Sequence, residues 1–261
     1  MKAVILCGGI GTRIRDISET LPKPMLPIGD KPILWHIMKS YSHYGIKDFV
    51  LCLGYKGWTI KEFFLNYHAK ISDVSVNLSK SNSIQFYAPA DEDDWNITLA
   101  ETGEKAQTGA RVFNVKKYLE GGKYFCLTYG DGVSDVNMKD LLGAHKNSGL
   151  ICTVTGVRPE GRFGELVIEG EKVVEFSEKT NVRSGYINGG FMVFDSSRIW
   201  KYFRPGDDLI LERDVLSRLA GDGQLGVFRH DGFWYCCDTP REYAILNNLW
   251  EEKKVPWKVW K

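Results

Sequence analysis

Glycines and basic residues crowd the start of this chain. The segment Gly8-Gly9-Ile10-Gly11-Thr12-Arg13 directly follows a short apolar run, Lys2–Leu6. Glycines let backbone N–H groups approach a polyphosphate, because no side chain stands in the way. Lys23 follows in Leu21-Pro22-Lys23-Pro24-Met25, where two prolines stiffen the backbone. A stiff mount lowers the entropy cost of binding, so the pattern favours a site for a phosphorylated ligand.

Two well-known phosphate motifs do not match this segment. A P-loop requires GxxxxGK[ST], and no lysine stands at the required place. A dinucleotide fingerprint requires GxGxxG, but Ile14 stands three positions after Gly11. A plain tight turn stays the alternative explanation of the glycines alone. Arg13 and Lys23 are the residues that favour phosphate binding.

Two aspartates each follow an apolar run and are candidates for a metal site. Asp131 lies in Thr128-Tyr-Gly-Asp-Gly132, and Asp238 lies in Trp234-Tyr-Cys-Cys-Asp238. Carboxylates at the ends of strands suit a hard cation that is shared with phosphates, and two of them on one Mg²⁺ is the expected arrangement. The alternatives are a turn residue between glycines for Asp131 and a helix N-cap for Asp238.

Strands and helices alternate along the first half of the chain. The apolar pattern predicts strands at Lys2–Leu6, 49–53 and 124–128, and helices at 32–44, 59–67, 112–119 and 138–145. This alternation predicts an α/β fold, Rossmann-like, with a mixed, mostly parallel sheet and helices on both faces. Ligands of such sheets bind outside the carboxyl ends of the strands, which is where the glycine segment lies.

The second half has a more antiparallel character. The pattern predicts strands at Cys152–Val157, 166–169, 173–177 and 190–194, and helices at 209–219 and 242–250. No repeat, low-complexity tract or linker interrupts the sequence. We therefore expect a single domain over 1–261, with a nucleotide-binding half at about 1–150 and a second-substrate half at about 151–261.

Composition excludes several classes of function. The 261 residues carry a formal net charge of +1 with acids and bases interspersed, so no stripe for nucleic acid or membrane is indicated. No apolar run approaches the roughly 18 residues of a membrane span. The six cysteines contain no CxxC pair, which predicts reduced core thiols in a cytoplasmic protein.

Gly-Gly-x-Gly-Thr-Arg followed by Pro-Lys-Pro-Met resembles the sugar-phosphate nucleotidylyltransferase family. Further matching segments are Lys31–Lys39, Tyr41–Gly45, Gly54–Gly57, Tyr129–Gly132, Gly161–Gly164, Ile187–Phe191 and Pro256–Lys258. Together they resemble the members that join CTP to glucose 1-phosphate, giving CDP-glucose and pyrophosphate. The resemblance implies a glycosyltransferase-A-like fold, Mg²⁺, a homo-oligomer (often a hexamer), and a role in making CDP-linked deoxysugars for lipopolysaccharide O-antigen.

The resemblance also implies a role for individual residues. Arg13 and Lys23 would be catalytic, aligning and neutralising phosphates while the sugar phosphate attacks the α-phosphorus in line. Metal ligands would be Asp131 and Asp238. The nucleotide contacts would be Leu6, Gly8, Gly9, Gly11, Thr12, Arg13, Lys23, Thr102, Gly103, Thr108, Arg111 and Gly130. The sugar-phosphate contacts would be Glu178, Lys179, Asn188 and Gly189.

Arg111 is the residue that we expect to select the base. Cytosine presents two acceptors, O2 and N3, whereas uracil and thymine carry a hydrogen on N3. Arginine is a pure donor, so Arg111 would pair with cytosine and oppose the other two bases. The alternative is a solvated arginine at the start of the helix over 112–119.

Three positions depart from the family pattern, and three other functions compete with this one. Thr180 stands where proline is usual, Ala110 replaces a glycine, and Cys236-Cys237 precede Asp238. The nearest competing function is the same chemistry with UTP or dTTP, or with another phosphorylated acceptor. A catalytically inactive nucleotide-sugar sensor could dispense with some of the proposed ligands. A nicotinamide-dependent dehydrogenase is disfavoured by the missing third glycine.

Overall fold

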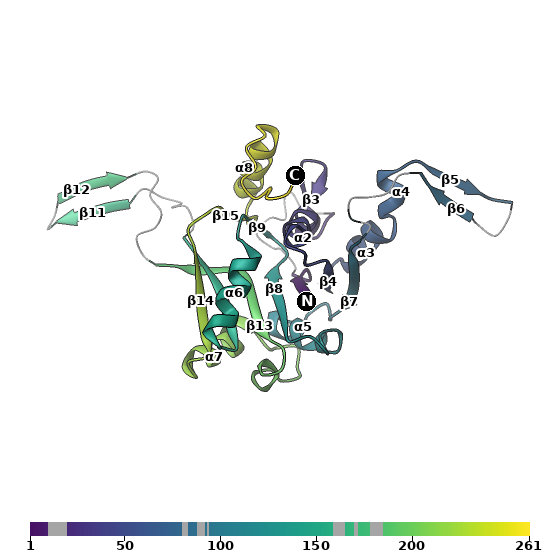
Figure 1. The fold of residues 1–261 in the computed structure, drawn as a ribbon. Coiled ribbons are helices and arrows are strands. Elements are labelled where there is room, and N and C mark those ends of the chain that lie inside the picture. Colours follow the sequence, from purple (N-terminus) through teal and green to yellow (C-terminus); the bar gives the residue numbers. More distant parts are fainter. Residues whose placement is uncertain are drawn as a thin grey trace.

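A seven-stranded sheet forms the centre of the computed structural model (Figure 1). The strand order is β14-β10-β13-β8-β1-β4-β7. The structure describes residues 1–9, 20–79, 83–87, 92, 94–158 and 185–261, and the backbone of 165–169 and 172–177. Gly11, Thr12, Arg13, Glu178, Lys179 and Thr180 lie outside the described residues.

The sheet is mixed and mostly parallel. Its strands are β1 (Lys2–Leu6), β4 (Asp48–Leu53), β7 (Asn96–Glu101), β8 (Tyr124–Tyr129), β10 (Cys152–Val157), β13 (Ile187–Asp195) and β14 (Leu225–His230). β1 pairs in parallel with both β4 and β8. β4 also pairs in parallel with β7, and β10 pairs in parallel with β14. β13 runs antiparallel between β8 and β10, which confirms the expected fold class and the mixed character of the second half.

Helices cover both faces of the sheet because its central strands are apolar on both sides. Ala3 and Ile5 face one core, whereas Val4 and Leu6 face the other. The first core is closed by α2 (Ile33–His43), α3 (Gly57–Leu65), α6 (Met138–Ser148) and α8 (Pro240–Glu251). The second core is closed by α5 (Thr108–Asn114), the π-helical turn η5 (Leu211–Leu216) and α7 (Ser217–Gly221).

Short elements complete the described chain. The remaining strands pair as β2 (Pro27–Ile28) with β3 (Lys31–Pro32), β5 (Val74–Asn77) with β6 (Ser83–Phe86), β9 (Gly132–Ser134) with β15 (Trp234–Cys236), and β11 (Glu165–Glu169) with β12 (Lys172–Ser177). The remaining helical pieces are α4 (Tyr67–Ile71) and the 3₁₀ turns η2 (Lys23–Met25), η3 (Lys116–Tyr118) and η4 (Ile199–Tyr202). The β5–β6 hairpin extends away from the sheet (Figure 1).

Several helices differ from the sequence-based expectation. The helix expected at 59–67 ends at Leu65, and α4 follows it as a separate element. The helix expected at 209–219 is the π-helical turn η5 joined to α7. The helix expected at 112–119 begins at Thr108, so Arg111 lies inside α5 and not at a helix start. Within the described chain, none of the helices has both the length and the apolar character of a membrane span.

The aromatic C-terminal tail folds back onto its own chain. Trp257 is 1% exposed and belongs to the first core. Its Nε1 donates a hydrogen bond to Nδ1 of His36, at 3.4 Å, and His36 also contacts the ring of Trp250. Trp257 therefore packs the tail against α2, and Trp250 of α8 contacts the same histidine.

Candidate active site

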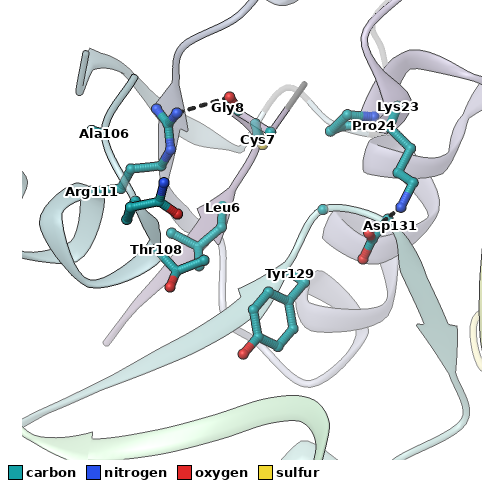
Figure 2. A pocket seen from close by; sticks show the side chains of 13 residues that line it. Leu6, Cys7, Gly8, Lys23, Pro24, Ala106, Thr108, Arg111, Tyr129 and Asp131 are labelled. Carbon is teal, nitrogen blue, oxygen red and sulfur yellow. Dashed lines mark hydrogen bonds and ion pairs between the residues drawn. The ribbon is translucent and has the colours of Figure 1, made fainter. Parts of the chain in front are cut away.

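A pocket opens at the carboxyl ends of β1 and β8 and contains residues that the sequence analysis placed in the nucleotide and metal sites (Figure 2). Figure 2 shows Arg111 on one side of it and Lys23 with Asp131 on the other. The lining residues are Leu6, Cys7, Gly8, Gly9, Lys23, Pro24, Ala106, Gln107, Thr108, Arg111, Tyr129, Gly130 and Asp131. Such a concave site at the ends of parallel strands is where open α/β folds bind ligands.

Lys23 joins the two predicted metal ligands. Its Nζ donates to Oδ2 of Asp131 at 2.9 Å and also to Oδ1 of Asp238. Burial lowers the pKa of Lys23, but the charges and hydrogen bonds of the two aspartates outweigh burial and raise this pKa above its usual value. The lysine is mounted on the 3₁₀ turn η2 between Pro22 and Pro24, which supports the stiff mount inferred from the prolines.

The two aspartates are 107 positions apart in sequence (238 minus 131), and strand pairing brings them together. Asp131 directly precedes β9, and β15 pairs antiparallel with β9, with Cys236 opposite Gly132. The backbone N–H of Cys237 then donates to the carbonyl of Asp131 at 2.8 Å. This pairing places the two carboxylates close enough to bind one cation, here the Lys23 ammonium group.

Asp238 is not the N-cap of the helix that follows. Thr239 occupies that position, and its side chain accepts from the backbone N–H of Glu242. The Glu242 carboxylate accepts in return from the backbone N–H groups of Asp238 and Thr239, at 2.7 and 2.9 Å. This reciprocal capping box fixes the backbone at Asp238, and the helix-cap alternative for that aspartate is overturned.

The donor set of this site fits a hard divalent cation. Carboxylate oxygens of Asp131 and Asp238 already share one positive group, and oxygen ligands are those that Mg²⁺ prefers. Ligand atoms of Cys236, Asp238 and Glu242 also lie within 4.8 Å of one another. Glu242 is committed to the capping box, and burial raises the pKa of the Cys236 thiol to about 12, so a soft thiolate site is disfavoured.

Arg111 is buried, with 4% of its surface exposed, and its terminal N–H groups contact protein acceptors. Nη1 donates to Gly103 O at 2.7 Å, to Thr102 Oγ1 at 2.9 Å and to Leu53 O at 3.0 Å. Nη2 donates to Gly8 O at 2.8 Å, as drawn in Figure 2, and to Glu104 O at 3.3 Å. The guanidinium group thus ties together the ends of β1, β4 and β7, and the solvated alternative is excluded.

The close approach of Arg111 explains why position 8 is a glycine. A Cβ atom on Gly8 would lie 2.1 Å from Nη1 of Arg111, and one on Gly54 would lie 2.4 Å from the same atom. Gly9 differs, because nothing lies within 4 Å of its Cβ position. At position 8 the missing side chain therefore makes room for an arginine of the protein itself.

Asn188 and Gly189, which are predicted to contact the sugar phosphate, lie on β13, next to β8. Asn188 Oδ1 accepts from the N–H of Gly190 at 3.0 Å, and the Gly189 carbonyl accepts from Trp234 Nε1 at 2.7 Å. Gly190 has φ +84°, and a Cβ atom there would lie 2.5 Å from the ring of Tyr129. Tyr129 in turn lines the pocket, so β13 and the pocket are in contact through this ring.

Sequence reasoning missed two residues of this region. Tyr129 ends β8 directly before Gly130 and Asp131, and that position at a strand end was a usable signal. Glu212 binds the hydroxyl groups of Tyr129 and Thr108 from a distant segment. No local pattern distinguished it from an ordinary surface glutamate.

Comparison with known proteins identifies the class of protein that has this fold and site. The sequence pattern of the nucleotidyl transferase family matches residues 2–239. The chain belongs to the nucleotidyl transferase family and is a nucleotidyltransferase enzyme.

Particular relatives are similar over the whole chain. The glucose-1-phosphate cytidylyltransferases of Salmonella typhi and Salmonella typhimurium are each 45% identical to it over 260 residues, covering 100% of both chains. The crystal structure of HddC from Yersinia pseudotuberculosis superposes with a TM-score of 0.64 at 24% identity, covering 95% of this chain and 99% of that one. This structural likeness shows the shared fold.

Proposed function

We propose that this enzyme transfers a cytidylyl group from CTP to α-D-glucose 1-phosphate, giving CDP-glucose and pyrophosphate. The observation that carries this proposal is the full-length identity of 45% to proteins named for that reaction. The pocket supports it, because Lys23 and two carboxylates converge at the carboxyl end of the sheet. A cytoplasmic location agrees with six cysteines that are all free thiols.

The reaction needs alignment and charge neutralisation more than acid–base chemistry. The 1-phosphate oxygen is already an anion near neutral pH, so it can attack the α-phosphorus in line without a general base. Mg²⁺ held by Asp131 and Asp238 would neutralise charge on the triphosphate and on the departing pyrophosphate. Lys23, beside these carboxylates, would hold the α-phosphate region. Arg13 and Lys179 are proposed to hold the leaving group and the attacking phosphate.

The remaining site residues divide between the two substrates. Leu6, Gly8, Gly9, Thr108 and Gly130 line the pocket and are proposed to contact the nucleotide, with Gly11 and Thr12 of the same glycine segment. Thr102 and Gly103 are proposed to act there through Arg111, from which the Thr102 hydroxyl and the Gly103 carbonyl both accept hydrogen bonds. Glu178, Asn188 and Gly189 are proposed to contact the sugar.

Selection of CTP by Arg111 stays a prediction with a defined cost. Its terminal N–H groups already contact protein acceptors, so pairing with cytosine means giving up or sharing one of these contacts. Comparison of CTP and UTP turnover by Arg111→Lys and Arg111→Ala tests this role. Variants that prefer CTP as strongly as the wild type would exclude it.

The activity is tested with the purified chain, Mg²⁺ and glucose 1-phosphate against CTP, UTP, dTTP and GTP. We expect pyrophosphate release with CTP far above the others and CDP-glucose as the product, identified by ion-exchange chromatography and mass spectrometry. EDTA should abolish turnover, and Asp131→Asn should depress it strongly. Turnover with another triphosphate, or with mannose 1-phosphate in place of glucose 1-phosphate, would replace this assignment. Sedimentation of the same sample tests the expected hexamer.

A further inference from the structure

Glu212 holds two hydroxyl groups that line the pocket, although it is not itself a lining residue. It stands at the beginning of the π-helical turn η5. Its Oε2 accepts from the hydroxyl of Thr108 at 2.7 Å, and its Oε1 accepts from the hydroxyl of Tyr129. One carboxylate therefore connects α5, on the nucleotide side, with the end of β8. π-helical turns inside helices are frequent at functional sites.

The contact between Glu212 and Thr108 is one of several hydrogen bonds between the start of α5 and residues 209–212. The Thr108 hydroxyl accepts from the backbone N–H of Leu211 at 3.0 Å while it donates to Glu212. The backbone N–H of Ala110 donates to the carbonyl of Leu209 at 3.0 Å. These hydrogen bonds hold the first turn of α5 against the segment that carries Glu212. The Thr108 hydroxyl uses its proton to donate to Glu212 and its oxygen to accept from Leu211.

The sugar-side contact fixes the ring of Tyr129. A carboxylate has no proton to give, so Tyr129 donates its hydroxyl proton to Glu212. A Cβ atom on Gly190 would lie 2.5 Å from the Tyr129 ring, so the ring packs directly against β13. At the same place on β13, Asn188 Oδ1 accepts from the N–H of Gly190 at 3.0 Å. The position of the Tyr129 ring is therefore coupled to the part of β13 that carries Asn188.

We propose that Glu212 is a positioning residue that braces both substrate subsites at once. Through Thr108 it holds the nucleotide-side wall, and through the Tyr129 ring it holds the part of β13 that carries Asn188 on the sugar side. This inference rests on the proposed function, because that function assigns Thr108 to the nucleotide and Asn188 to the sugar phosphate. Loss of the Glu212 carboxylate should therefore affect both substrate subsites, whereas loss of the Thr108 or the Tyr129 hydroxyl should affect only one.

The two arms of the brace can be separated by mutation. Steady-state KM values for both substrates, kcat and thermal unfolding are measured for Glu212→Ala, Thr108→Val and Tyr129→Phe. We expect Thr108→Val to raise KM for the triphosphate about tenfold and Tyr129→Phe to raise KM for the sugar phosphate about tenfold, each leaving the other KM within twofold. Glu212→Ala should raise both. Thr108→Ser, which keeps the hydroxyl, should restore KM for the triphosphate.

A double-mutant cycle distinguishes a direct effect of Glu212 through Tyr129 from a general destabilisation of the protein. Glu212→Ala combined with Tyr129→Phe should raise KM for the sugar phosphate no further than either change alone. Glu251→Ala, an exposed glutamate at the end of α8, serves as the matched control and should change neither KM. Unchanged KM values in Glu212→Ala, or additive effects in the cycle, overturn the proposal.

The proposed function and this inference fail in different ways. If the wild type makes no CDP-glucose, the proposed function fails. The brace is then tested with whichever triphosphate and sugar phosphate the wild type does turn over. If the wild type makes CDP-glucose and the KM values do not separate as stated, only the inference fails. A Glu212→Ala protein that does not fold leaves Thr108→Val and Tyr129→Phe to decide the question.

Discussion

The proposed metal site predicts that the Lys23 ammonium group and a divalent cation compete for the same two carboxylates. Lys23 Nζ lies 2.9 Å from Asp131 and also contacts Asp238, which are the proposed metal ligands. We predict that Lys23→Met tightens metal binding in the absence of nucleotide and destabilises the protein when metal is chelated. The reason is that methionine fills a similar volume but leaves two neighbouring like charges without the shared cation.

The magnitude follows from the exposure of the three groups. The side chains of Lys23, Asp131 and Asp238 are 13%, 29% and 25% exposed, so they lie between a buried and a surface ion pair. Breaking a buried pair costs about 3–5 kcal/mol and a surface pair about 0–1 kcal/mol. We therefore expect a loss of about 2 kcal/mol in the free energy of unfolding. The same free energy, as relieved competition, corresponds to about thirtyfold tighter metal binding.

Urea unfolding in EDTA and in excess Mg²⁺ measures the stability, and calorimetric titration with Mn²⁺ measures the affinity. Lys47→Met is the matched control, because Lys47 also binds an aspartate, Asp94, but both side chains are largely exposed. It should change stability by less than about 0.5 kcal/mol and leave Mn²⁺ binding unchanged. Equal Mn²⁺ affinity in Lys23→Met and wild type, with equal stability in EDTA, would show that the lysine and the metal do not share ligands.

Three further changes have outcomes that the structure defines. Gly8→Ala should lower the free energy of unfolding by about 2–4 kcal/mol, and the unfolding temperature with it, because its Cβ meets the Arg111 guanidinium. Gly9→Ala should be almost neutral, and equal melting curves for the two variants would contradict this. Burial lowers the pKa of His36 to about 4. As the pH falls, His36 therefore takes up a proton in the unfolded chain before it does so in the folded protein. The free energy of unfolding should be highest above about pH 6.5 and should fall by about 3 kcal/mol between about pH 6.5 and pH 4. Urea midpoints across this range test it, and an equal slope in His36→Gln would refute the assignment. Thr239→Ala should cost about 1 kcal/mol in urea unfolding through loss of the capping box, and no loss would contradict that role of the threonine.

Elements with dense apolar runs were predictable from the sequence. β1 and β10 match the expected ranges, and α2 (Ile33–His43) lies within the expected helix at 32–44. Two sheet-edge strands, β7 and β14, were not identified. Edge strands have one neighbour and a partly exposed face, so their sequences are less apolar and resemble loops. Their places are decided by pairing with β4 and β10, which lies outside any local sequence window.

The site was predictable in its residue types but not in its contacts. The approach of Asp131 to Asp238 depends on the pairing of β9 with β15, two strands of three residues each that no periodicity reveals. The burial of Arg111 was also hidden, because an arginine within a polar segment is usually solvated. From the sequence, the missing side chain of Gly8 was expected to make room for a phosphate. In the structure, the space that a side chain at position 8 would fill is occupied by the guanidinium group of Arg111.

Arg111 and Lys23 therefore serve the site in different ways, although both are cations of the same pocket. The acceptors of Arg111 include backbone carbonyls of three different chain segments, so its guanidinium group holds the ends of three strands together. Releasing one hydrogen bond of a buried charged group costs about 1.5–3 kcal/mol, and pairing of Arg111 with cytosine would have to offset this cost. The acceptors of Lys23 are the two carboxylates that are proposed to bind the divalent cation. On that proposal, the metal would take over these carboxylates, and the Lys23 ammonium group would then contact a phosphate of the bound triphosphate.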